Sequence, residues 1–312
     1  MGFVKILSTI ALTVALCFPF SVSGASAQNV ELTYAGSSLP QLQSWMSPEI
    51  ADAWRQGYQG NGTRITVVDD FSSSWGYWGN LGTGTQLLRH GEWVRLEASM
   101  IAPSATMASH DFHSGRAVRL GRNQLNTLNL SYGMFAVDGH NVRNIRWSNQ
   151  ESSIISYARD GKAVVVKAAG NDSVAVGAAN SDGLADYLNR ALIGTRSAIF
   201  VGALDRNGTT ANPARMAWYS NFAGTDSTVQ NQFLTVGVRG DLTGLYGTSF
   251  AAPIISGYAA VLGSKFRKSS PTQIANRLLN TARTDTISGY DAAIHGRGEA
   301  SISRALAPVS IR

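Results

Sequence analysis

Ser249 lies where a buried helix should begin, a place that suits a nucleophile. The stretch GTSFAAPIISGYAAVLG, residues 247–263, is apolar almost all round from Phe250 on, as in a helix inside a protein. Pro253 is tolerated only in the first turn of a helix, so the pattern predicts a helix that begins just after Ser249 and ends at Gly263. The dipole and the N–H groups at such an end favour a developing oxyanion. On this stretch alone, an ordinary serine N-cap is the preferred interpretation.

Three further residues supply what a serine nucleophile lacks. A hydroxyl needs a base that takes its proton, a carboxylate that orients the base, and donors for the oxyanion. His90 in LRHGEWV is a candidate base at the start of a helix, Asp69 ends the strand pattern ITVVD, and Asn171 ends VVVKAAGN. Each residue has an ordinary alternative, because a lone histidine is more often structural, a strand-end aspartate can be a cap, and asparagine is common in turns.

The surrounding pattern predicts an α/β fold of three layers, in which a mostly parallel β-sheet carries helices on both faces. Strands are expected at 63–71, 100–112, 125–133, 162–171 and 197–205, and helices at 47–62, 149–161, 250–263 and 270–282. Helices that alternate with apolar strands favour a parallel sheet, whose active residues gather beyond the carboxyl ends of the strands. Asp69, Gly133 and Asn171 all stand at such ends.

The first 27 residues have the pattern of a secretory signal peptide. They contain one lysine, an apolar stretch, and Ala25-Ser26-Ala27 as the expected cleavage site. An uncleaved membrane anchor is the less favoured alternative, because the apolar run is short and contains Pro19. The protein is therefore expected to be secreted or periplasmic and to leave the membrane after cleavage. Cys17 is the only cysteine, so the mature chain is expected to have no disulfide, cysteine nucleophile or thiolate metal site.

Composition and charge exclude some other classes. Hydrophobic content of 44% with only 15% charged residues favours a compact exported protein. The net charge of +6 is spread without a dense run of Lys and Arg, so no nucleic-acid partner is expected.

Together these segments resemble the subtilisin-like serine proteases, the subtilase family (peptidase S8). ITVVD resembles the strand that carries the family's catalytic aspartate, HG..V its histidine motif, LNLSYG the strand that pairs with substrate, AAGN the oxyanion segment, and GTSFAAPIISG the nucleophile motif. The order Asp69, His90, Ser249 is the family's order and differs from that of chymotrypsin-like enzymes and α/β-hydrolases. The resemblance covers nearly all of residues 45–308 and implies a subtilisin-like catalytic domain over 28–312.

The resemblance also implies a role for each residue. Ser249 attacks the scissile carbonyl, His90 takes its proton and later protonates the leaving amine, and Asp69 orients the imidazole. The side chain of Asn171 and the backbone N–H of Ser249 hold the oxyanion. Substrate is expected to pair by strand addition with Leu130, Ser131, Tyr132 and Gly133, while Ala168, Ala169 and Gly170 wall the pocket for the residue before the cleaved bond.

The expected function is hydrolysis of peptide or protein substrates by an exported serine endopeptidase, through an acyl-enzyme intermediate and without a cofactor or metal. Two alternatives use the same fold. One is a catalytically silent binding module, and the other is a peptide ligase or transamidase that uses the same triad.

The sequence departs from the family pattern in four places. Asp70 stands where a small hydroxyl residue is usual, so it could perturb the triad or replace Asp69 as the partner of the histidine. The short distance between His90 and the next predicted strand leaves no room for the family's calcium loop, so no calcium site is expected there. No N-terminal prodomain fits between the signal peptide and Asp69, so the chain is expected to fold unaided or with a helper or inhibitor in trans. The segment 172–196 is longer than the usual pocket loop and is expected to form a lid, to reshape the specificity pocket, or to be a surface elaboration.

One polar stretch offers a weak metal pattern. The sequence SHDFH brings His110, Asp111 and His113 close together, but no fourth ligand is evident, and a polar loop is the preferred interpretation.

Overall fold

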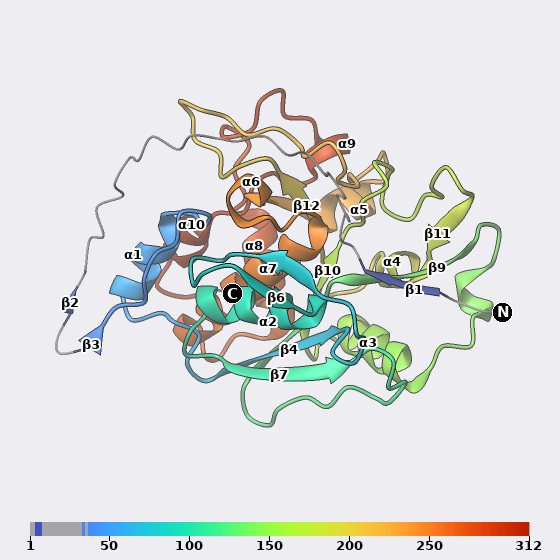
Figure 1. Ribbon diagram of the computed structural model, residues 1–312, viewed down its shortest axis with the longest axis horizontal. Helices are drawn as coiled ribbons and strands as arrows, with labels where there is room; N and C mark the ends of the chain where they lie inside the picture. The colour runs from blue at the N-terminus through green and yellow to red at the C-terminus, as the bar shows by residue number, and fades with distance from the viewer. Residues whose placement is uncertain (1–3, 8–32, 35–36, 312) are drawn as a thin grey trace.

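A six-stranded parallel sheet forms the centre of the molecule (Figure 1). The computed structural model describes residues 4–7, 33–34 and 37–311. In spatial order, the strands are β13 (Phe233–Gly237), β12 (Ala198–Leu204), β10 (Val164–Ala168), β8 (Leu125–Leu130), β4 (Thr63–Asp69) and β7 (Thr106–Asp111). The expected mostly parallel sheet is therefore confirmed.

Helices cover both faces of this sheet, which gives the three expected layers. One face carries α2 (His90–Ile101), α7 (Ala252–Lys265) and α8 (Pro271–Asn280), with α1 (Glu49–Arg55) and α10 (Ile302–Leu306) beside them. The other face carries α3 (Asn149–Asp160), α4 (Tyr187–Leu192) and α5 (Ser227–Gln232).

Alternating strand residues build a hydrophobic core on each face. Val164 and Val166 of β10 join the core under α2 and α7, while Val165 between them joins the core under α3. Strands buried on both sides read as continuous apolar runs, which is why the sequence marks them clearly. Helix α7 is buried along nearly its whole length, as its composition predicts, and Pro253 lies in its first turn.

A second, small sheet lies beyond the carboxyl ends of the central strands. It consists of β1 (Val4–Leu7), β9 (Tyr132–Val137) and β11 (Leu184–Asp186), with β9 in the middle and both neighbours antiparallel to it. Two small two-stranded sheets and four further short elements complete the described chain. The sheets pair β2 (Thr33–Tyr34) with β3 (Ser37–Ser38) and β5 (Tyr77–Gly79) with β6 (Gln86–Leu88). The other elements are η1 (Val142–Asn144), α6 (Gly240–Thr243), η2 (Thr248–Phe250) and α9 (Ala292–His295).

The structure corrects two of the expected strands and adds one that was not expected. The expected strand 100–112 is wrong at its start, because Ala98 and Ile101 pack one helical turn apart in the core and so belong to α2. The expected strand 125–133 is two strands, since β8 ends at Leu130 and the chain enters the small sheet at Tyr132. Strand β13, at the edge of the central sheet, has no counterpart among the expected strands.

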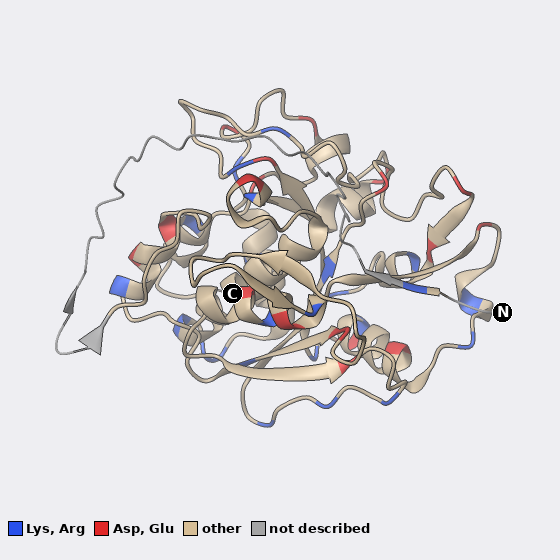
Figure 2. Cartoon of the chain, in the orientation of Figure 1, with Lys and Arg blue, Asp and Glu red and all other residues tan. Residues whose placement is uncertain are grey.

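Charges of both signs are distributed around the described chain (Figure 2). Within the described residues, every helix is too short or too polar to span a bilayer. The expected cleavage site at Ala25-Ser26-Ala27 lies outside the described residues, so signal-peptide removal stays a prediction.

Candidate functional site

Asp69 and His90 form a buried pair at the end of β4. The His90 Nδ1 and Asp69 Oδ1 atoms are 2.6 Å apart, and both side chains are fully buried. Burial raises the pKa of Asp69, and the attraction and hydrogen bond of His90 partly offset that rise. The carboxylate therefore fixes the imidazole with Nδ1 toward it and leaves Nε2 for another partner.

The start of α2 delivers His90 to this place. Helix α2 begins at His90 itself, as expected, and the Gly91 N–H donates to the carbonyl of Asp70 at 3.1 Å. A side chain at Gly91 would put its Cβ 2.8 Å from that carbonyl oxygen and 3.0 Å from the Asp69 Cβ. The His-Gly pair is thus required for the helix to approach the end of β4 so closely.

Ser249 lies in the turn that leads into α7, next to Phe250, whose ring packs on His90. The His90 ring packs between Tyr77 and Phe250, with ring centroids 5.8 and 5.7 Å away. His90 Nε2 is buried and has no hydrogen-bond partner among the described residues. The Ser249 hydroxyl donates to the Ser131 carbonyl at 3.1 Å, so it points toward the end of β8 in this structure.

Asn171 presents an amide toward the same turn. Its Oδ1 accepts hydrogen bonds from the Thr248 N–H at 2.9 Å and from the Thr248 hydroxyl at 3.0 Å. Both bonds point the amide nitrogen away from Thr248, and that buried Nδ2 has no partner within the described part of the chain. An oriented amide N–H without a partner can donate to a charged oxygen without first breaking another hydrogen bond.

The Asp70 carboxylate binds the turn that follows it rather than His90. Its carboxylate accepts from the Ser72 N–H at 3.2 Å and the Ser73 N–H at 2.9 Å. Burial raises the pKa of Asp70, but the hydrogen bonds from Ser73 and Ser72 outweigh it and lower the pKa below its usual value. The contact to His90 thus belongs to Asp69, and Asp70 closes the turn after β4.

The residues expected to bind substrate gather at the ends of β8, β9 and β10. In the central sheet, Leu130 is in register with Lys167, next to Ala168. Ser131 links β8 to β9, and its hydroxyl donates to the Ser249 carbonyl at 2.9 Å. Ala169 and Gly170 follow β10, and the Gly170 N–H donates to the Thr248 hydroxyl at 3.1 Å.

Strand β9 contains the other two expected substrate residues, Tyr132 and Gly133. A Cβ at Gly133 would lie 2.4 Å from a Phe135 ring carbon and 2.8 Å from an Asp186 carboxylate oxygen, so a side chain here would displace both neighbours. The edge of β9 away from β11 is paired with β1, with Val4 opposite Phe135 and Leu7 opposite Tyr132. An extended segment antiparallel to β9 is the arrangement expected of a substrate, and here a segment of the chain itself adopts it.

The long segment 172–196 supports β9 from behind. It forms β11, which pairs with the far edge of β9, and α4. Asp186 accepts from the Met134 N–H at 2.9 Å and forms a buried ion pair of 3.0 Å with Lys167. Through these contacts the segment fixes β9 to β10.

The polar stretch 109–113 forms hydrogen bonds within the protein. His110 Nε2 lies 3.1 Å from the Gln150 side-chain oxygen, and Asp111 accepts from the backbone of Phe71 and of His113. Among the described residues, no group of three or more metal-ligating side chains is close enough to hold an ion.

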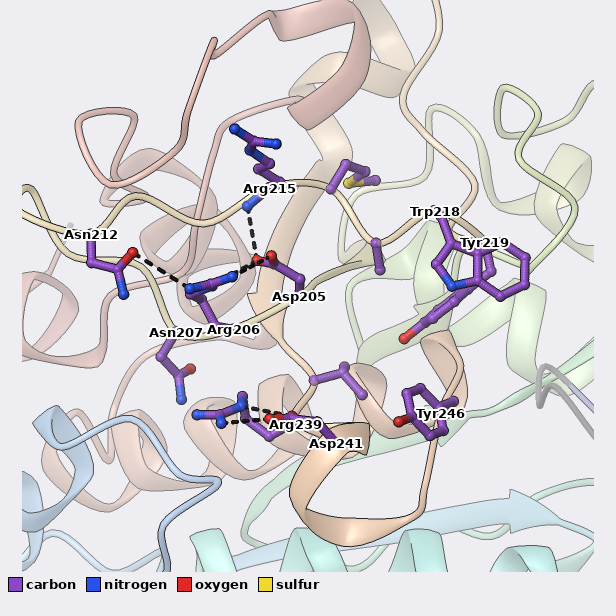
Figure 3. A pocket seen from close by; sticks show the side chains of 13 residues that line it. Asp205, Arg206, Asn207, Asn212, Arg215, Trp218, Tyr219, Arg239, Asp241 and Tyr246 are labelled. Carbon is purple, nitrogen blue, oxygen red and sulfur yellow. Dashed lines mark hydrogen bonds and ion pairs between the residues drawn. The ribbon is translucent and has the colours of Figure 1, made fainter. Parts of the chain in front are cut away.

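A separate pocket of about 690 Å³ opens beside Tyr246, just before the Gly247-Thr248-Ser249 motif (Figure 3). Two of its three arginines pair with its two aspartates, Arg206 with Asp205 at 3.0 Å and Arg239 with Asp241 at 2.7 Å. We assign this pocket no part in the chemistry of Ser249.

Several residues that shape the site were not singled out by sequence reasoning. Thr248 holds Asn171, and Asp186 holds β9, yet both contacts join segments far apart in the chain. The Thr in GTS was visible in the motif, but its spacing alone does not reveal the amide that it contacts.

Comparisons with known proteins identify the family of the chain. A family model described as "Subtilase family" matches residues 98–298, more than half of the chain, a span that includes Asn171 and Ser249 but begins after Asp69 and His90. Among curated protein sequences, none matches significantly.

Three solved structures of similar fold are distant from this chain in sequence. A structure entitled prenylagaramide maturation protease PagA has a TM-score of 0.54 and 18% identity, over 83% of this chain and 98% of that one. A lanthipeptide protease has a TM-score of 0.52 and 17% identity, over 84% and 93%. MycP1 from the ESX-1 type VII secretion system has a TM-score of 0.52 and 19% identity, over 90% of both chains. At these identities the likeness concerns the fold.

Proposed function

Since the chain belongs to the subtilase family of serine-type peptidases, we propose that it is an exported serine endopeptidase with Ser249 as nucleophile. The observation that carries the proposal is the oriented His90, whose Nδ1 is held by Asp69 while its buried Nε2 has no partner in the described chain. A nucleophile, a base and an orienting acid in this order of contact are what acyl transfer needs.

In the proposed mechanism, His90 removes the Ser249 proton as the hydroxyl attacks the peptide carbonyl. Rotation about the Cα–Cβ bond of Ser249 turns the hydroxyl from the Ser131 carbonyl toward Nε2, and hydrogen bonds of this kind commonly tighten only when substrate binds. Asp69 stabilises the imidazolium, which then protonates the leaving amine. Water hydrolyses the acyl-enzyme by the reverse sequence of proton transfers.

In this proposal, two donors stabilise the tetrahedral oxyanion. They are the side-chain Nδ2 of Asn171 and the backbone N–H of Ser249, in the turn that leads into α7. The two hydrogen bonds from Thr248 orient the amide before substrate arrives, so no reorganisation is needed at the moment of reaction. No calcium ion or other cofactor takes part in the proposed chemistry. The uninterrupted helix from His90 to Ile101 supports the absence of the family's calcium loop at this place.

An active-site probe tests the proposal directly. A fluorophosphonate should label the wild-type protein covalently and should not label Ser249→Ala or His90→Ala. Mass spectrometry should find the adduct on the peptide that contains Ser249. Cleavage of a denatured protein substrate should disappear in the same two variants. An unlabelled wild-type protein that still binds peptides would support a binding module instead, and amide products formed with an added amine would support a transamidase.

A further inference from the structure

Lys5 shows how a basic side chain fits beside β9. In β1, Lys5 stands opposite Met134, and its ammonium lies 2.9 Å from Glu151 Oε1. It also donates to the Phe112 carbonyl and lies 5.7 Å from the ring centroids of both Phe112 and Tyr132. An anion, a carbonyl and two aromatic faces are together a receptor for a cation.

Glu151 is held in place as a buried acceptor. Ser148 donates to its Oε2, while the Gln150 side-chain amide, at 2.9 Å, and the Tyr132 hydroxyl, at 3.4 Å, donate to its Oε1. The side chain is 1% exposed and lies in the first turn of α3, where the helix dipole favours negative charge. All three of these donors are neutral, and Lys5 makes the one ion pair to Glu151 within the described residues.

The strand register relates this pocket to the nucleophile. Lys5 is opposite Met134 and Leu7 is opposite Tyr132, so the next position of an extended peptide faces Ser131. The Ser131 carbonyl is the group that accepts the Ser249 hydroxyl. A peptide bound in this register therefore presents to Ser249 the residue that lies three positions after its basic residue.

We propose that the Glu151 pocket selects substrates with Lys or Arg at the fourth residue before the cleaved bond. The inference rests on the proposed peptidase function and adds a specificity-determining residue to it. In this view β1 occupies the place of a substrate segment, and Lys5 occupies the place of its basic side chain. A neutral side chain at that position would leave a buried carboxylate without its cation, which is costly.

The preference can be measured with two fluorogenic peptide pools. The pools differ only at the fourth residue before the reporter, which is lysine in one and norleucine in the other, and the three intervening positions are equimolar mixtures. All protein forms carry Lys5→Ala, so that the chain's own lysine does not compete for the pocket in any molecule that keeps its first 27 residues. We expect the lysine pool to have a kcat/KM at least about tenfold higher, since a hydrogen bond to a charged group is involved.

Glu151→Gln should bring this ratio close to one. Glutamine keeps the size of the side chain and an oxygen that can accept from Ser148, and it removes the charge. Asp160→Asn is the matched control, because it removes a carboxylate from the exposed end of the same helix and should leave the ratio unchanged. Thermal unfolding of each variant shows whether the fold is retained. Even if Glu151→Gln does not fold, the ratio of kcat/KM for the two pools in the parent protein still tests the proposal.

A binding measurement separates this inference from the proposed function. Fluorescence anisotropy with labelled lysine and norleucine peptides on the Ser249→Ala form reports selection without cleavage. If neither pool is cleaved but the lysine peptide binds better, the pocket is supported and the peptidase proposal is wrong. If both pools are cleaved and bound equally, or if Glu151→Gln keeps the lysine preference, the pocket assignment is overturned.

Discussion

Thr248 should affect catalysis only through Asn171, and its replacement tests how the oxyanion donor is oriented. Thr248→Val keeps the shape of the side chain and removes its hydroxyl. The Asn171 oxygen then loses the 3.0 Å bond and keeps the 2.9 Å bond from the backbone N–H. One hydrogen bond contributes about 0.5–1.5 kcal/mol net, so kcat should fall about 2- to 13-fold with little change in KM.

A double-mutant cycle distinguishes orientation from general damage. Asn171→Ala removes the donor itself and should lower kcat roughly 10²–10³-fold, a magnitude that is borrowed from subtilisin rather than worked out for this chain. Adding Thr248→Val to Asn171→Ala should then cost less than about twofold, because the hydroxyl has no amide left to orient.

The assay is steady-state cleavage of one peptide by all four proteins, with thermal unfolding as a control. Thr248→Val also leaves the Gly170 N–H without its acceptor, so some loss of stability is expected in both backgrounds. If the substitution lowers kcat as much in Asn171→Ala as in the wild type, Thr248 acts on something other than the amide, and the reasoning fails.

Three further predictions concern the acidic residues and calcium. Asp69→Asn should lower kcat by about 10⁴-fold, whereas Asp70→Asn should change it by less than about threefold, because only Asp69 contacts His90; equal losses would contradict the assignment. Burial raises the pKa of Glu97 well above 4.5, and its Oε2 has no partner among the described residues. As pH rises from about 4.5, the unfolded state loses this proton before the folded state does. The free energy of unfolding should therefore fall over this range. Urea unfolding at several pH values should show this slope in the wild type and a weaker slope in Glu97→Gln. Chelation with EDTA should change neither peptide cleavage nor the melting temperature, and a loss of either would show a metal requirement.

The sequence predicts well those parts of the site that are encoded in short local patterns. The buried strand ending at Asp69, the helix beginning at His90 and the buried helix after Ser249 each follow from apolar periodicity with a clear boundary. Family resemblance then orders them. The structure adds that Asp69 and His90 make contact, which no local pattern can establish.

The parts that the sequence does not predict depend on contacts between distant segments. The break between β8 and β9 at Ser131 lies inside a continuous alternating pattern, LNLSYG, and only the pairing of β9 with a different sheet reveals it. The capping pattern of Ser148 and Glu151 is visible in the sequence. That its carboxylate faces β9 depends on how α3 packs, so the pocket that we propose could not be found from spacing alone.

The exposed edge that β9 would offer once β1 is absent has a consequence for what the protein can digest. Backbone pairing along this edge needs several consecutive residues of the target in extended form with their amide groups unengaged. A helix or a well-packed loop of a folded protein does not provide such a stretch. Native targets should therefore be cut in tails and unstructured linkers, or at a rate set by how often a region of the target opens.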